Sequence, residues 1–202
     1  MNTVKKEEPY STKEKIISAS VELFSKYGYT KVTMRDIAAV VGIKAGSIYH
    51  FFSSKRNILN YIYQFSVEQH RKAQPDLDEL LRRAETDSPQ ELIEVFNFGL
   101  DPTERKLNET ILLIAMHEIT HDDDSAHFVE DVLFYPIDHI LAPVLQRMVA
   151  LGRIELFDIP AFICTVKNYC FGAAMLGASP LKTEREIRDR SFSLLFSIPR
   201  PS

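Results

Sequence analysis

The sequence is poor in several residue types and patterns that mark particular classes of protein. It contains no tryptophan, two cysteines, seven glycines and ten prolines among 202 residues, so neither a low-complexity chain nor a disulfide-rich domain is expected. The longest purely apolar run, ILLIAM at 111–116, is far shorter than the roughly 20 residues of a membrane-spanning helix. Residues 1–15 contain no apolar stretch of the kind found in signal peptides. We therefore expect a cytoplasmic protein with no membrane partner.

The charge is distributed unevenly along the chain. Residues 1–60 carry ten Lys and Arg against five Asp and Glu, a net charge of +5, although the whole chain has a net charge of −4. The remaining residues therefore carry a net charge of −9. A basic amino-terminal segment on an acidic body favours a module that faces a polyanion such as nucleic acid. Chance clustering of charges on solvated helix faces is the alternative.

Apolar residues recur at three- and four-residue steps along the chain, and no useful stretch alternates as a strand does. The sequence therefore predicts an all-α protein of about nine helices. Two domains are expected: residues 1–55, with a flexible arm over 1–10, and residues 56–202. Pro136 and Pro143 are expected to kink or break the helical stretch over 125–151.

Residues 33–52, TMRDIAAVVGIKAGSIYHFF, have the pattern of a helix-turn-helix. Thr33 and Asp36 form a capping-box pair at the start of one short helix, and Gly42 ends that helix. A second short helix is expected over 44–52. Its outward side chains are small at the start and polar along its length, which lets a helix approach the major groove closely. A helical corner that does not bind DNA would share the pattern.

These residues resemble the tetracycline-repressor (TetR) family of bacterial transcription regulators. The resemblance rests on LFSKYGYTKVTMRDIAAVVGI, on KAGSIYHFFSSKRNIL and on the chain length, and it is specific over about the first 60 residues. It implies an amino-terminal three-helix DNA-binding domain joined to a larger helical domain that binds a small-molecule effector. It also implies a homodimer on a pseudo-palindromic double-stranded operator, and a binding protein with no enzymatic activity.

The resemblance assigns DNA-binding roles to nine residues. Thr33 would bind a phosphate, Arg35 would lie near the backbone or an outer base edge, and Lys55 would hold a second phosphate at a helix amino terminus. Tyr49 and His50 would contact phosphates, although partial burial of Tyr49 is an alternative. The groove-entering end of the recognition helix would consist of Lys44, Ala45, Gly46 and Ser47.

The carboxy-terminal helices are the expected dimer contact. The resemblance implies a four-helix bundle made by 158–178 and 183–198 from each copy. The small residues of FGAAMLGAS at 171–179 allow close helix approach, and packing within one chain would explain them equally.

Residues 117–121, HEITH, match the His-Glu-x-x-His pattern of zinc peptidases. No recognisable third ligand follows, so no metal is assigned to the site and a zinc-dependent hydrolase is only the last alternative. Helical spacing indicates that His117 and His121 point inward. Three interpretations stay open for them: packing among polar neighbours, hydrogen bonding to an effector, or ligation of a metal or haem with His127 or an aspartate of 122–124.

An effector pocket is expected in the second domain. The candidate lining residues are aromatic, apolar or imidazole side chains of the second domain: Phe96, Leu113, His117, His121, Phe128, Phe134 and Tyr169. Core packing explains most such aromatic residues equally well. Such walls would suit an apolar or aromatic effector. The hypothesis is a ligand-responsive repressor without a cofactor, with a metal- or haem-sensing regulator as the alternative.

Overall fold

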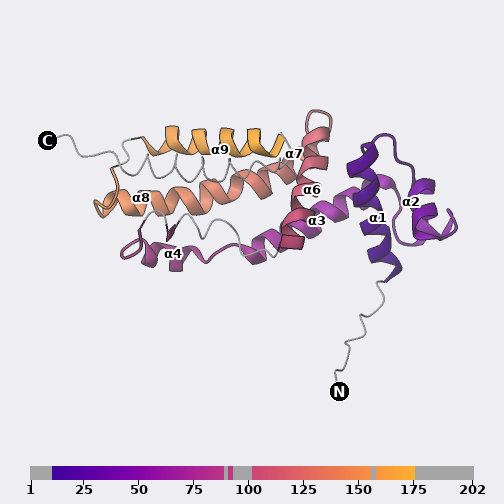
Figure 1. The fold of residues 1–202 in the computed structure, drawn as a ribbon, viewed down its shortest axis with the longest axis horizontal. Coiled ribbons are helices and arrows are strands. Elements are labelled where there is room, and N and C mark those ends of the chain that lie inside the picture. Colours follow the sequence, from indigo (N-terminus) through magenta and orange to yellow (C-terminus); the bar gives the residue numbers. More distant parts are fainter. Residues whose placement is uncertain (1–10, 89–90, 93–101, 156–157, 176–202) are drawn as a thin grey trace, which may run out of the picture. The chain divides into compact units, whose positions relative to one another are not determined.

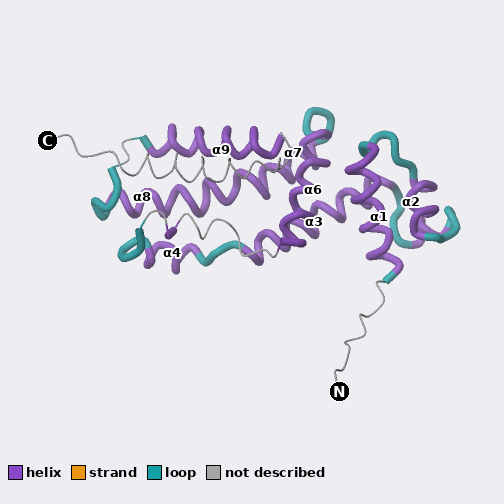
Figure 2. Tube along the Cα trace, viewed as in Figure 1, coloured by secondary structure: helices purple, strands orange, loops and turns teal. Residues whose placement is uncertain are grey.

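The computed structural model describes residues 11–88, 91–92, 102–155 and 158–175, and every regular element in these ranges is helical (Figures 1 and 2). The all-α prediction is thus confirmed for the described part of the chain. The chain divides into two compact units, residues 1–65 and 66–202, whereas the sequence placed a boundary at 55/56. No helix among the described residues is long and apolar enough to span a membrane.

The first unit contains α1 (Thr12–Tyr27), α2 (Met34–Val41), the 3-10 helix η1 (Ser47–His50) and the start of α3 (Lys55–Ala73). A capping box between Ser11 and Glu14 starts α1. The buried apolar side chains come from every element of the unit, so the short helices are held by a shared core: Ile16, Phe24, Val32, Ile37, Ala38, Ile48, Phe52, Ile58, Leu59 and Ile62.

The second unit contains the rest of α3, followed by α4 (Leu77–Arg83), α6 (Pro102–Glu118), α7 (Asp123–Val129), α8 (Ala142–Ala150) and α9 (Ile159–Met175). Helix α8 packs between α4 and α9 (Figure 1). Its buried residues Val144, Leu145 and Met148 belong to the main apolar cluster, together with Leu80 of α4 and Phe162 of α9.

The chain stays helical from α7 to α8, although two prolines were expected to kink or break it. Two π-helical segments, η2 (Glu130–Phe134) and η3 (Ile137–Leu141), join the two helices. Pro136 lies between these segments and Pro143 lies in the first turn of α8. A π-helical turn is wider than an α-helical turn and can accommodate the N–H that a proline lacks. The chain therefore does not break at these prolines, although π-helical segments interrupt the α-helix beside them.

Candidate nucleic-acid interface

The amino end of α2 is fixed by a complete capping box. The Thr33 backbone N–H and hydroxyl donate to Asp36 Oδ2 at 2.8 and 2.7 Å, and the Asp36 N–H donates to Thr33 Oγ1 at 3.2 Å. The Thr33 hydroxyl and N–H together lower the pKa of the exposed Asp36 carboxyl. Thr33 is itself exposed, so its side chain is accessible at the start of the helix.

The turn between α2 and the recognition segment depends on one glycine. Gly42 has φ 77° and ψ 29°, the left-handed conformation that closes many helices. Its N–H donates to the Ala39 carbonyl at 3.2 Å, and the Ile43 N–H donates to the Ala38 carbonyl at 3.0 Å. The chain can therefore reverse within a few residues and bring η1 against α2.

The recognition segment is shorter than predicted. The sequence indicated a helix over 44–52, whereas the structure has a turn closed by the Ser47 N–H on the Lys44 carbonyl at 2.8 Å, followed by η1. Gly46 and Ser47 are poor helix formers, which explains the loss of the first turn. Ile48, with no exposed surface, anchors the segment, and its carbonyl accepts from the Phe51 and Phe52 N–H groups.

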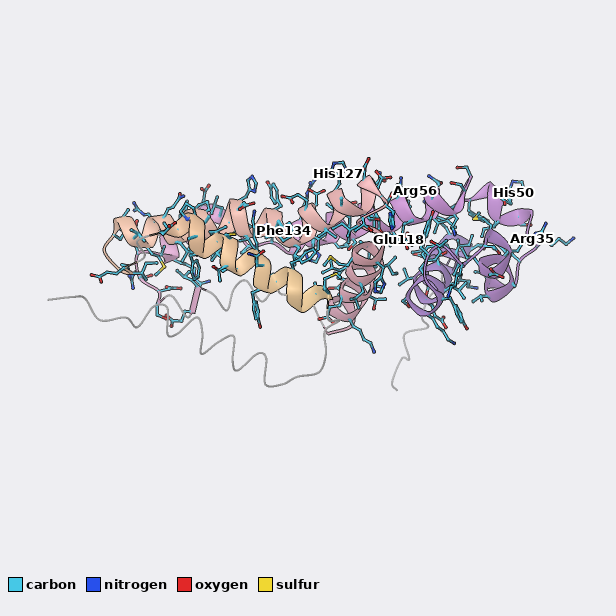
Figure 3. All side chains as sticks on the ribbon, turned by 90° about the horizontal axis from the view of Figure 1, so that it is seen from above. Arg35, His50, Arg56, Glu118, His127 and Phe134 are labelled. Atoms are coloured by element: carbon cyan, nitrogen blue, oxygen red, sulfur yellow. The ribbon has the colours of Figure 1, made fainter. Side chains whose placement is uncertain are left out.

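Most of the predicted DNA-binding side chains lie on the surface. Arg35, Lys44, Ala45, Gly46 and His50 are exposed, and Ser47 is half-buried. Tyr49 is 55% exposed, which disfavours the alternative that it packs against α1. Figure 3 shows Arg35 and His50 in the part of the first unit that α2 and η1 form.

Lys55 is placed differently from the prediction of a phosphate-binding side chain. Its Nζ donates to the carbonyls of Tyr29 at 2.6 Å, Thr30 at 3.3 Å and Val32 at 2.7 Å. The ammonium therefore lies among backbone oxygens of the loop between α1 and α2. A long side chain at the start of α3 can reach that loop only because the folded chain returns to it, which spacing along the sequence does not reveal.

Lys31 is a cation that the prediction omitted from the interface. It is exposed and lies two residues before the Thr33 cap. Its position just before a helix amino terminus could have indicated a phosphate contact, since such termini bind phosphates. Lys13, by contrast, lies over the Tyr61 ring at 3.9 Å from its centroid, so it contributes to packing between α1 and α3.

The structure corrects the expectation for the two histidines of HEITH. Both His117 and His121 are exposed. Helix α6 ends at Glu118, so His121 lies in the following turn, and His117 lies about 120° around the helix from the buried Ile111. Among the residues that the structure describes, no three His, Cys, Asp or Glu side chains are grouped as a metal site would require.

The remaining pocket candidates do not share one environment. Phe128 is 2% exposed, Leu113 and Phe134 are half-buried, and Tyr169 is 42% exposed. Phe96 lies outside the described residues. Figure 3 shows Phe134, which stacks on Phe171 with ring centroids 6.2 Å apart. Aromatic packing between η2 and α9 therefore accounts for Phe134 without a ligand.

Buried polar groups on α3 were missed by the sequence reasoning. Ser66 is 1% exposed and donates to Asn108 Oδ1 of α6 at 2.9 Å. His70, one turn further on, is 8% exposed, and burial lowers the pKa of its imidazole. The i, i+4 spacing was visible in the sequence, but polar residues at this spacing are usually assigned to a solvated face.

In the described part of the expected dimer contact, the middle of α9 has an uncharged exposed surface, and the exposed Asp158 lies at its start. The exposed positions in the middle of α9 are Cys164, Thr165, Asn168 and Tyr169. Lys167 is half-buried and pairs with Asp138. Residues 176–202, which contain the 183–198 segment, lie outside the described residues.

Comparison with known proteins agrees with this geometry. A family model for bacterial regulatory proteins of the tetR family matches residues 16–62, which include most of α1 and all of α2 and η1. The chain is 30% identical over 128 residues to the HTH-type transcriptional regulator TtgR of Pseudomonas putida, covering 59% of this chain and 56% of TtgR. It is 48% identical over 56 residues to the icaADBC biofilm-operon negative transcriptional regulator IcaR of Staphylococcus aureus, covering 28% of each. The aligned region thus spans little more than half the length of TtgR.

Solved structures extend the likeness over nearly the whole chain. The TetR family transcriptional regulator PfmR of Thermus thermophilus matches with a TM-score of 0.64 and 18% identity, covering 92% of this chain and 99% of that chain. GusR of Salmonella enterica matches with a TM-score of 0.59 and 16% identity, covering 96% and 100%. At these identities the likeness shows a common fold.

Proposed function

Since the chain belongs to the TetR family of bacterial regulatory proteins, we propose that it is a ligand-responsive DNA-binding transcriptional regulator. The observation that carries the proposal is the recognition segment, whose polar and small residues are exposed while Ile48 anchors it in the core. A surface of this kind can enter a major groove without unfolding. The expected location is the cytoplasm, where the DNA lies.

The interface suggests a division of roles between phosphates and bases. The exposed Thr33 cap and its helix amino terminus suit a phosphate, and Arg35, Tyr49 and His50 supply further donors. The segment from Lys44 to Ser47 is the part narrow enough to approach base edges. Ala45 has only a methyl group and Gly46 has no side chain, so this segment has few groups that can bind base edges. Close approach and DNA shape are therefore expected to determine much of the specificity.

In more detail, we propose that the protein is a homodimeric repressor and that a small-molecule effector releases it from DNA. IcaR, which this chain resembles over its amino-terminal part, is named a negative regulator. The uncharged exposed face of α9 suits the dimer contact through 158–178, with 183–198 as the second expected helix. The proposed effector is apolar or aromatic, because the sequence of the second unit contains many aromatic residues.

Selection of duplexes from a random pool by the purified protein tests the proposal. Enrichment of a palindrome bound with strong salt dependence is the expected result. Arg35→Ala should then lower the slope of log K against log salt by about 0.9, the value for one phosphate contact. Lys106→Ala, which removes an exposed lysine of α6, is the charge-matched control and should leave the slope unchanged. Absence of any enriched sequence would contradict the proposed function.

A further inference from the structure

The environment of the Lys55 side chain is formed by residues that are distant from it in the sequence. Three carbonyl oxygens of the α1–α2 loop, from Tyr29, Thr30 and Val32, lie 2.6, 3.3 and 2.7 Å from Nζ. The Tyr29 ring centroid lies 4.2 Å from the same nitrogen. An ammonium group has three N–H donors, and each of these carbonyls can accept from one of them.

These carbonyls lie in a loop, where no helix or sheet ladder supplies N–H groups. The contacts of Lys55 with Tyr29 and Val32 are part-buried and that with Thr30 is exposed, so the ammonium takes the place of water as their donor. The loop is also held from its other side, because Tyr29 packs edge-on against the buried Phe24 with ring centroids 5.2 Å apart. Val32, 3% exposed, enters the core of the first unit.

The position of Lys55 in α3 also favours a contact with the loop carbonyls. It is the first residue of α3, directly after Ser54, whose hydroxyl accepts the Asn57 N–H at 3.0 Å. A cation at a helix amino terminus is disfavoured by the helix dipole. The three carbonyl dipoles that point at Nζ offset this cost.

We propose that Lys55 is a positioning residue that fixes the amino end of α2 through the backbone of residues 29–32. The loop that it holds ends at Thr33, the cap of α2, whose N–H binds Asp36. Moving the loop moves the cap and the phosphate-facing end of α2 with it. The DNA-binding consequence rests on the proposed function, whereas the internal contact does not depend on DNA.

The first test uses the full chain without DNA. Lys55→Met removes the ammonium and keeps a long apolar stem, and Lys31→Met, in the same loop but exposed, is the matched control. Amide hydrogen exchange of Thr33, Asp36 and Ile37, whose N–H groups are bonded within the cap, is the readout. We expect exchange at least about tenfold faster in Lys55→Met and unchanged in the control. Unchanged exchange in Lys55→Met would overturn the proposal.

The second test uses the selected operator duplex and separates positioning from phosphate binding. Lys55→Met should weaken binding without changing the slope of log K against log salt, because no phosphate contact is lost. A phosphate ligand would lower that slope by about 0.9. A lower slope in Lys55→Met, with or without faster exchange, would overturn the proposal.

Lys55→Arg provides a milder variant in case Lys55→Met does not fold. A guanidinium binds phosphate at least as well as an ammonium does, but its planar fork does not converge on three carbonyls around one point. The positioning role therefore predicts weaker binding and faster cap exchange in Lys55→Arg, whereas full retention of both properties would overturn it. If the unmodified protein binds no duplex, the proposed function fails, and the exchange measurement still decides the role of Lys55.

Discussion

Replacing Ile48 with Ala should separate the stability of the first unit from its contacts with DNA. Ile48 has no exposed surface, so the substitution removes buried methyl and methylene groups and leaves a cavity. Such changes cost about 2–5 kcal/mol. A unit of 65 residues has a free energy of unfolding of roughly 3–10 kcal/mol, at about 0.05–0.15 kcal/mol per residue. Ile48→Ala should therefore remove about half of that stability.

The neighbouring residue supplies the control. Tyr49 is 55% exposed, so Tyr49→Ala should change the unfolding free energy by no more than about 0.5 kcal/mol. If its hydroxyl donates to a phosphate, the lost hydrogen bond to a charged group is worth about 1.5–3 kcal/mol, which is roughly a 10- to 100-fold loss of affinity. The two variants should thus show opposite patterns of stability and binding.

Amide exchange is the assay for stability, because the slowest amides of α1 and α2 report unfolding of the first unit by itself. DNA affinity is measured on the same samples at low temperature, where the folded fraction of Ile48→Ala stays high. A loss below about 1 kcal/mol in Ile48→Ala would refute the reasoning that Ile48 anchors the recognition segment. So would a loss in Tyr49→Ala as large as that in Ile48→Ala.

Three further outcomes follow from the described residues. Gly42→Ala should destabilise the first unit by about 1–2 kcal/mol, because a φ of 77° strains the backbone of a residue with a Cβ. A Cβ at this position meets no atom within 4 Å, so no steric clash adds to the strain. Urea denaturation measures the loss, and an unchanged midpoint would contradict the prediction. Burial lowers the pKa of His70 below 6.5, so the unfolded state binds more protons, and stability should fall as pH drops below about 6.5 toward the folded pKa. His70→Gln should remove that part of the pH dependence, as measured by unfolding between pH 5 and 8. His117→Ala and His121→Ala should each change the unfolding free energy by no more than about 0.5 kcal/mol, since both side chains are exposed, and a larger loss would show that they are packed in solution.

The sequence was a good guide wherever the governing interactions are local. The Thr33–Asp36 capping box and the Gly42 stop bound α2 in the structure as they did in the prediction, because a cap bonds residues only three positions apart. The buried face of α2, Ile37 and Ala38, likewise follows from the helical period. The helical period also predicted that HEITH is helical. His117 and Glu118 do lie in α6, whereas the last three residues of HEITH follow its end.

The sequence by itself therefore determined the helical class of the described residues and the ends of α2. It also determined the family resemblance and the exposure of the recognition segment. Only the tertiary structure decided that Lys55 reaches a carbonyl 26 positions earlier in the chain, and that His117 and His121 face solvent. Helix caps and helical periodicity are set by bonds between residues a few positions apart. The partner of a long side chain, and the exposure of a residue near a helix end, depend on which distant segments pack beside it.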